Sequence, residues 1–223
     1  MVRNMNIQEL IKLALPDAVS SLESASAADV QNEKEFTFYA LLSDMKDLSI
    51  ADKSERHEQW SICIDKKGHK ARIRGIDDSE FELTTKSKIS SIESLETTCE
   101  IPKEMFQSLK KMGKDGYFKQ RYYFNINSVS ELTWEVDVFH LNGGEQDCWV
   151  KIDLEIDDVT KEIPKFPVRC ERVIWADDPN VTEADQRLID QLWDERWQKI
   201  DTDPVIITED TEKYDIEIEI GGV

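Results

Sequence analysis

Charged side chains recur at every second position along six stretches of this 223-residue sequence that resemble β-strands. Alternation with a period of two places these side chains on one face of a strand and the intervening aliphatic residues on the other. Basic groups in such an array could hold phosphate oxygens, and carboxylates could ligate divalent cations, which prefer oxygen. The bases are Arg72, Arg74, Lys86, Lys119, Arg121 and Lys151, and the acids are Glu33, Glu35, Glu82, Glu135, Asp137, Asp153 and Glu155.

Two interpretations of these charged faces are open. Charge on a strand usually marks the solvated face of a half-buried sheet. These faces are almost purely ionic, however, whereas solvated faces more often include Thr, Ser, Gln and Asn. Strands closed into a barrel can turn the charged face into the lumen and the aliphatic face outward, under helices. The barrel interpretation places these residues outside the lumen: Ile73, Leu83, Val136, Val138, Ile152 and Leu154.

A charged lumen carries a physical requirement. Unpaired buried charges are costly, so the charges inside such a barrel need partners of opposite sign, water and a charged ligand. Sequence leaves Glu135 and Asp137 two roles of nearly equal weight, either as supports for a metal ion or as ion-pair partners that orient the bases.

The strands group into two antiparallel meanders. The first comprises 60–65, 70–76 and 80–89, with good turn sequences at 66–69 and 77–79. The second comprises 117–126, 132–141 and 148–157, and a separate strand is expected at 33–41. The fold class predicted is α+β, an antiparallel β-barrel that forms a tunnel with a charged lumen and has helices packed outside.

Helices are expected at three places. The segment 101–113 ends at Gly113, and the segment 182–198 begins with a capping signature from Thr182 to Asp185. An amphipathic pattern also predicts a helix near the N-terminus, followed by a polar linker at 21–32. The stretch 43–60 looks irregular with a short helix. The chain thus divides into an N-terminal helical extension (1–30), a tunnel domain (31–200) and an acidic tail with a late strand (201–223).

Composition limits the functions open to the chain. A net charge of −19 argues against binding to a nucleic-acid backbone, which needs a basic surface, but it leaves a phosphorylated substrate open. No apolar run is long enough to span a membrane. The four cysteines form no CxxC pair, which disfavours zinc and a disulfide framework and fits a reducing, cytoplasmic setting. The three histidines form no ligand pattern and are expected at the surface or in packing.

The charged stretches resemble, in order and spacing, the motifs of the CYTH superfamily, the triphosphate tunnel metalloenzymes. The matching segments cover about residues 33–175 and read EKEFT at 33–37, RIR at 72–74, LTTK at 83–86, KQR at 119–121, EVDVF at 135–139 and KIDLE at 151–155. The family includes adenylyl cyclases and several triphosphatases. The resemblance implies a tunnel that binds a triphosphate-containing small molecule and uses Mg²⁺ or Mn²⁺.

The resemblance also implies roles for individual residues. Phosphate would be bound by Arg72, Arg74, Lys86, Lys119 and Arg121. Metal would be bound by Glu33, Glu35, Glu135, Asp137, Asp153 and Glu155. Glu33, Glu35 and Lys151 would be the catalytic residues. Two departures put turnover in question: Thr37 replaces the lysine that ends the family signature, and Lys151 replaces the first acid of the last strand.

Three functions remain open at this stage. The first is metal-dependent hydrolysis of a triphosphate, and the second is a tunnel that binds or sequesters a nucleotide or polyphosphate with little or no catalysis. The third is an interaction protein whose acidic surface mimics a polyanion. A cyclase is compatible with the fold, but no base-recognition feature is visible in the sequence. Oligomeric state is left open, with a homodimer among the alternatives.

Overall fold

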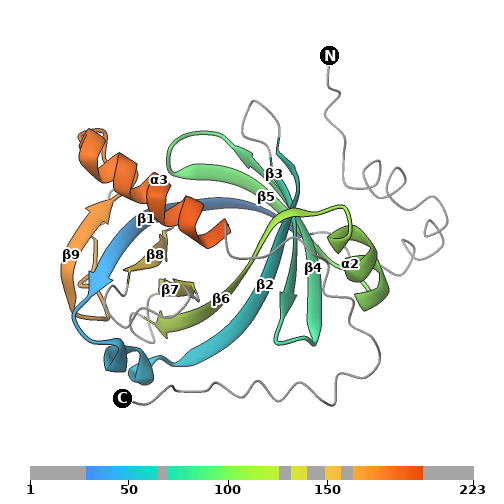
Figure 1. The fold of residues 1–223 in the computed structure, drawn as a ribbon, viewed down its shortest axis with the longest axis horizontal. Coiled ribbons are helices and arrows are strands. Elements are labelled where there is room, and N and C mark those ends of the chain that lie inside the picture. The colour runs from blue at the N-terminus through green and yellow to red at the C-terminus, as the bar shows by residue number, and fades with distance from the viewer. Residues whose placement is uncertain (1–28, 65–69, 126–131, 140–148, 157–162, 198–223) are drawn as a thin grey trace, which may run out of the picture.

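The computed structural model describes residues 29–64, 70–125, 132–139, 149–156 and 163–197. These residues form one sheet of nine strands, and each strand pairs antiparallel with its neighbours (Figure 1). The strands are β1 (Asp29–Leu42), β2 (Lys53–Ile64), β3 (Lys70–Ile76), β4 (Glu80–Lys88), β5 (Glu93–Glu100), β6 (Lys114–Asn125), β7 (Thr133–Phe139), β8 (Trp149–Glu155) and β9 (Cys170–Trp175).

The long strand β1 closes the sheet into a barrel. Its first part, 29–34, pairs with β5, and its second part, 35–41, pairs with β8. The remaining pairs follow the order β5-β4-β3-β2-β6-β7-β8, so eight strands form a ring. β9 lies outside this ring and pairs with 38–42 of β1. The predicted α+β fold, an antiparallel barrel, is confirmed.

Two apolar clusters lie on the outside of the barrel. In one, Ile73 and Leu83 are completely buried beneath the helix α2 (Lys103–Lys110), which contributes Met105, Phe106 and Leu109. Full burial of an aliphatic side chain of this size contributes about 1.5–3 kcal/mol. The prediction that the aliphatic faces point away from the lumen is therefore correct on this side of the barrel.

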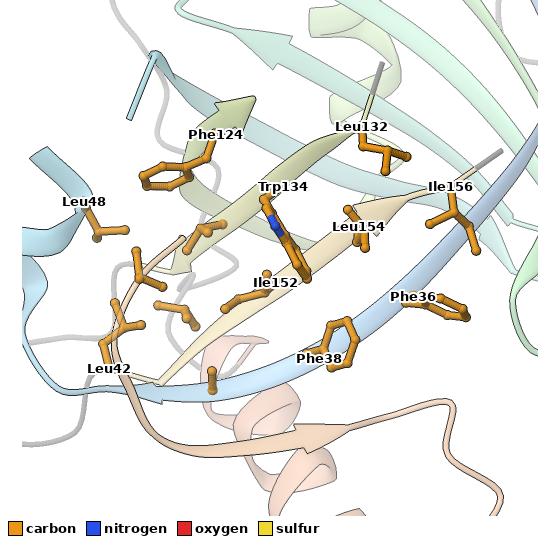
Figure 2. Packing of buried hydrophobic residues seen from close by; sticks show 14 residues of the cluster. Phe36, Phe38, Leu42, Leu48, Phe124, Leu132, Trp134, Ile152, Leu154 and Ile156 are labelled. Atoms are coloured by element: carbon orange, nitrogen blue, oxygen red, sulfur yellow. The ribbon is translucent and has the colours of Figure 1, made fainter. Parts of the chain in front are cut away.

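The second cluster surrounds Trp134 (Figure 2). It contains Val136, Ile152 and Leu154, all completely buried, and Val138 packs at its edge. The expectation that helices cover these residues is only partly correct. Here the cover comes from Leu48 of the short 3₁₀ helix η2 (Met45–Ile50) and from residues 166–168 of a connecting segment.

The third helix, α3 (Glu183–Trp197), confirms the predicted capping signature: the Thr182 hydroxyl and the Asp185 carboxylate and backbone N–H are hydrogen-bonded to one another. Its Ile189 and Leu192 pack with Tyr39 and Ile174, so α3 lies over β1 and β9 (Figure 1). Within the described residues, no helix has the length and apolar character that crossing a membrane requires.

Several strand boundaries differ from the sequence prediction. β2 begins at Lys53, seven residues before the expected start. The early part of this strand is polar on both faces, so the sequence shows no alternation there. β5 and β9 were not predicted, and β1 begins at Asp29, inside the expected linker. The predicted N-terminal helix and C-terminal strand lie outside the described residues.

Candidate functional site

The barrel encloses a cavity of about 880 Å³, lined by side chains from all eight ring strands. Every charged residue singled out from the sequence lines this cavity, so the charged strand faces look inward. The group comprises Glu33, Glu35, Arg72, Arg74, Glu82, Lys86, Lys119, Arg121, Glu135, Asp137, Lys151, Asp153 and Glu155. The period-two alternation thus gathers residues that lie up to 122 positions apart in the sequence.

Asp137 on β7 is the most completely engaged carboxylate of the lumen. It is 1% exposed and accepts hydrogen bonds from Lys119 Nζ at 2.6 Å and from Arg121 Nε and Nη2 at 2.6 and 2.8 Å. Burial disfavours its charge, but Arg121 and Lys119 hold the pKa of Asp137 well below its ordinary value. Arg121 also donates to Glu135. These contacts favour the ion-pair role for both acids.

Lys86 on β4 sits among three carboxylates. Its ammonium donates to Glu33 and, at 3.1 Å, to Glu35, and it lies 3.7 Å from Glu96. Burial and the neighbouring charge of Glu35 raise the pKa of Glu33. Glu35 behaves oppositely: although partial burial opposes its charge, Lys151 and Lys86 lower its pKa to about 2. The pKa values of the two signature acids are therefore shifted in opposite directions, and both acids contact the same ammonium group.

The arginines of β3 are held by carboxylates of neighbouring strands. Arg72 Nη2 donates to Glu96 Oε1 at 3.1 Å, while Arg74 donates through Nε and Nη2 to Glu82 Oε2 at 3.0 and 2.8 Å. The Nε of Arg72 is buried without a hydrogen-bond partner. Arg72 therefore keeps an unused donor in the lumen.

The two departures from the family pattern lie next to each other. Thr37 and Asp153 are register partners on β1 and β8, and the Thr37 hydroxyl donates to Asp153 Oδ1 at 2.9 Å. The ammonium of Lys151 donates to the other oxygen of the same carboxylate. Despite burial, the charges of Asp153, Glu35 and Asp137 raise the pKa of Lys151, which keeps it protonated. An ammonium thus stands beside position 37, supplied by a different strand.

Glu155 on β8 and Lys70 on β3 are among the charged groups of the lumen that form no ion pair with any described residue. Although residue Glu155 is exposed at the edge of the barrel, partial burial of its carboxyl group and the charges of Glu135, Glu33 and Glu35 raise its pKa to about 7. Burial and the nearby bases Lys86 and Lys151 lower the pKa of Lys70. Glu155 lies among negative charges and Lys70 lies among positive charges, so each site favours a ligand of the opposite charge.

A divalent cation matches this donor set in chemistry but has no preassembled site. In the part of the chain that the structure describes, no three Asp, Glu, His or Cys side chains are grouped so as to hold a metal ion. The carboxylates of Glu33, Glu35 and Glu155 are hard oxygen donors that raise one another's affinity for positive charge. An ammonium, that of Lys86, already lies between two of them. A metal bound here would need further oxygens from the substrate.

Sequence reasoning missed several lining residues. Lys70 shares the parity of Arg72 and Arg74, and that signal was available. His57 and Gln59 lie in the early part of β2, which shows no alternation of polar and apolar residues, and Glu96 lies in β5, which is rich in Ser, Thr and Glu. His57, expected at the surface or in packing, lies completely buried in the lumen wall.

Comparison with known proteins leaves the family open. No family model matches the chain, and no curated protein matches it. Solved structures with a similar arrangement include the inorganic triphosphatase NE1496, with 18% identity and a TM-score of 0.40 over 66% of this chain and 88% of that one. HpAC1 from Hippeastrum, a candidate adenylyl cyclase with a dominant triphosphatase activity, has 18% identity and a TM-score of 0.38 over 56% and 80% of the two chains.

A third structure, the PH1819 protein from Pyrococcus horikoshii OT3, has 16% identity and a TM-score of 0.38 over 72% of this chain and 89% of that one. At identities this low and TM-scores below 0.5, these likenesses do not decide the function of the chain.

Proposed function

We propose that this chain is a divergent member of the CYTH superfamily that hydrolyses a triphosphate-containing substrate inside its barrel, with a divalent cation bound beside the substrate. The observation that carries the proposal is the lumen itself. Basic side chains from β3, β4, β6 and β8 converge with carboxylates from five strands in a single cavity of about 880 Å³. Ligand pockets commonly occupy about 300–1,000 Å³, so the cavity is large enough for a small molecule.

The phosphate groups would be bound by the bases that are least committed to internal partners. Lys70 has no carboxylate partner among the described residues, and Arg72 keeps its Nε donor unused. Lys86 would exchange carboxylate oxygens for phosphate oxygens. Lys119 and Arg121 remain fixed by Asp137, which holds their positive charges in place before the substrate arrives.

A metal ion would be held by Glu33, Glu35 and Glu155, with Asp153 close by. When bound, a divalent cation polarises a phosphoryl group and neutralises charge that develops on it. Burial and the charges of Glu135, Glu33 and Glu35 raise the pKa of Glu155 to about 7, and a bound cation would relieve this repulsion between carboxylates.

Thr37 is expected to make catalysis slow. Lys151 supplies an ammonium near position 37, but that ammonium is bound to Asp153, as is the Thr37 hydroxyl. The same contacts support the second candidate, a tunnel that binds a nucleotide or polyphosphate without turnover. Both candidates require the charged lumen, and they differ only in catalysis.

Phosphate release from a panel of triphosphates tests the proposal. ATP, GTP, thiamine triphosphate and tripolyphosphate would each be incubated with Mg²⁺, with Mn²⁺ and with EDTA. Slow, metal-dependent release from at least one of them is expected, and Glu35→Gln is expected to abolish it. Binding that is independent of metal, with no release from any compound, would reject the enzyme and leave the sequestering tunnel.

A further inference from the structure

One wall of the lumen contains a buried polar atom that a phosphate oxygen cannot satisfy. His57 on β2 is completely buried and lines the cavity. Its Nε2 lies 3.1 Å from Glu55 Oε2, while its Nδ1 is buried with no hydrogen-bond partner. Buried polar atoms normally have a partner, so an orphaned one in a cavity wall points to a ligand.

The surroundings of Glu55 fix which nitrogen of His57 carries the proton. Glu55 accepts hydrogen bonds from Lys53 and, at 2.7 Å, from the Tyr123 hydroxyl. Although partly buried, it has its pKa lowered to about 2 by these partners, so it is ionised. An ionised carboxylate only accepts, and His57 must therefore donate through Nε2.

The imidazole itself is neutral. Burial and the positive charges of Lys119 and Arg74 lower the pKa of His57 to about 3, and the hydrogen bond to Glu55 does not restore it. A neutral imidazole protonated at Nε2 has a lone pair at Nδ1. That atom can only accept a hydrogen bond.

Gln59 adds a second unsatisfied group two residues along the same strand face. Its Nε2 donates to the Tyr117 hydroxyl at 2.6 Å, and its Oε1 is buried with no partner. Reversing the amide would leave the NH₂ group unsatisfied instead, so one polar atom of Gln59 lacks a partner in either orientation. His57 and Gln59 together are called the β2 polar pair below.

The β2 polar pair lies beside two basic residues of the lumen. His57 is the register partner of Lys119, and Gln59 is the register partner of Arg74. Directly opposed residues of antiparallel strands are about 4.5–5.5 Å apart at Cβ. Rings line the same part of the cavity, since Tyr117 and Phe139 have centroids 5.7 Å apart and Phe139 is opposite Lys119.

Ionised phosphate oxygens are hydrogen-bond acceptors, so they can pair with the basic groups of the lumen but not with the lone pair of His57. We propose that the β2 polar pair binds the organic part of the substrate through a hydroxyl or N–H donor, so that the substrate is a triphosphate ester such as a nucleoside triphosphate rather than bare tripolyphosphate. This inference rests on the proposed function and narrows its substrate class.

The test compares ATP with two analogues that lack particular hydrogen-bond donors and with tripolyphosphate, which lacks the organic part. ATP, 2′,3′-dideoxy-ATP, purine riboside triphosphate and tripolyphosphate would be titrated by calorimetry without metal, so that no turnover occurs. The wild-type protein is expected to bind ATP at least about tenfold more tightly than tripolyphosphate, and to lose about tenfold with one of the two analogues, as one buried hydrogen bond predicts. The sensitive analogue identifies the donor as a ribose hydroxyl or the base amine.

Two variants sharpen the test. His57→Phe keeps a ring and removes the acceptor, and is expected to lower the ratio of ATP affinity to tripolyphosphate affinity about tenfold. Arg72→Ala, the matched control, removes a phosphate contact and should lower both affinities while leaving their ratio unchanged. If His57→Phe does not fold, Gln59→Met and the wild-type analogue series give the same comparison.

The outcomes separate this inference from the function on which it rests. If the wild-type protein binds ATP, both analogues and tripolyphosphate with equal affinity, the inference is overturned and triphosphate binding stands. Water would then be the hydrogen-bond partner of His57 Nδ1. No binding of any triphosphate, tripolyphosphate included, either without metal or with Mg²⁺, would overturn the proposed function and the inference together.

Discussion

Removing the charge of Asp137 should destabilise the protein and make its stability depend on an anion. Asp137→Asn keeps the shape of the side chain but leaves Lys119, which is 4% exposed, and Arg121 without their shared countercharge. Breaking a buried ion pair by removing one partner costs about 3–5 kcal/mol. A domain of this size loses about 2–4 °C in Tm per kcal/mol, so a decrease of about 6–20 °C is expected.

Tripolyphosphate should reverse much of this loss, since its oxygens can replace the missing carboxylate. Thermal melting followed by circular dichroism, with and without tripolyphosphate, measures both effects. A ligand at 100 times its Kd stabilises by about 2.7 kcal/mol, and the increase in Tm should be larger for Asp137→Asn than for wild type.

Asp190→Asn is the matched control, because Asp190 is exposed on α3 and contacts only Gln186 among the hydrogen bonds of the described residues. It should change stability by less than about 0.5 kcal/mol. An Asp137→Asn protein as stable as wild type would refute the view that this carboxylate holds the two bases.

Three further expectations concern the lumen. Arg72→Ala should weaken triphosphate binding about tenfold to a hundredfold in calorimetry while leaving Tm nearly unchanged. If the variant instead unfolds and its affinity per folded molecule is unchanged, Arg72 is a structural ion-pair partner of Glu96. Glu155→Gln should stabilise the protein above pH 7 by up to about 1 kcal/mol after solvent screening, and should have no such effect at pH 4. The reason is that a pKa raised from 4.5 to about 7 makes ionised Glu155 unfavourable in the folded protein as the pH rises through that range. Equal shifts in Tm at both pH values would exclude this explanation. Thr37→Lys alone would place two ammonium groups beside Asp153 and should lower Tm. The double variant Thr37→Lys with Lys151→Glu should instead raise the rate of phosphate release. A double variant no faster than wild type would show that Thr37 is not the cause of slow turnover.

Strand periodicity predicted that the charged residues share one face of each strand, but it left open whether that face met solvent or the lumen of a barrel. Wherever one face is aliphatic, as at Ile73 or Ile152, the opposite face is set by geometry alone, and the charged residues had to share a side. Ionic faces of both signs on six strands favoured closure, because such charges can pair when the faces meet, and the resemblance to the tunnel family added to that argument.

The remaining parts of the site carried no periodic signal. The early part of β2 is polar on both faces, with Arg56 and Glu58 outside and Glu55 and His57 inside, so it resembles a loop in sequence. β5 is rich in Ser, Thr and Glu for a similar reason. The ion-pair partner of each charged residue could not be predicted from the sequence either. That Asp137 binds two bases, while Glu155 binds none among the described residues, depends on strand register.

Calorimetric titration of ATP into the wild-type protein, repeated at two salt concentrations and with Arg72→Ala, tests the central claim most directly. One ATP should bind per chain, more weakly at higher salt because exposed charge interactions are screened, and about tenfold or more weakly in the variant. Absence of binding, or binding that neither salt nor Arg72→Ala alters, would contradict a lumen built to hold a triphosphate.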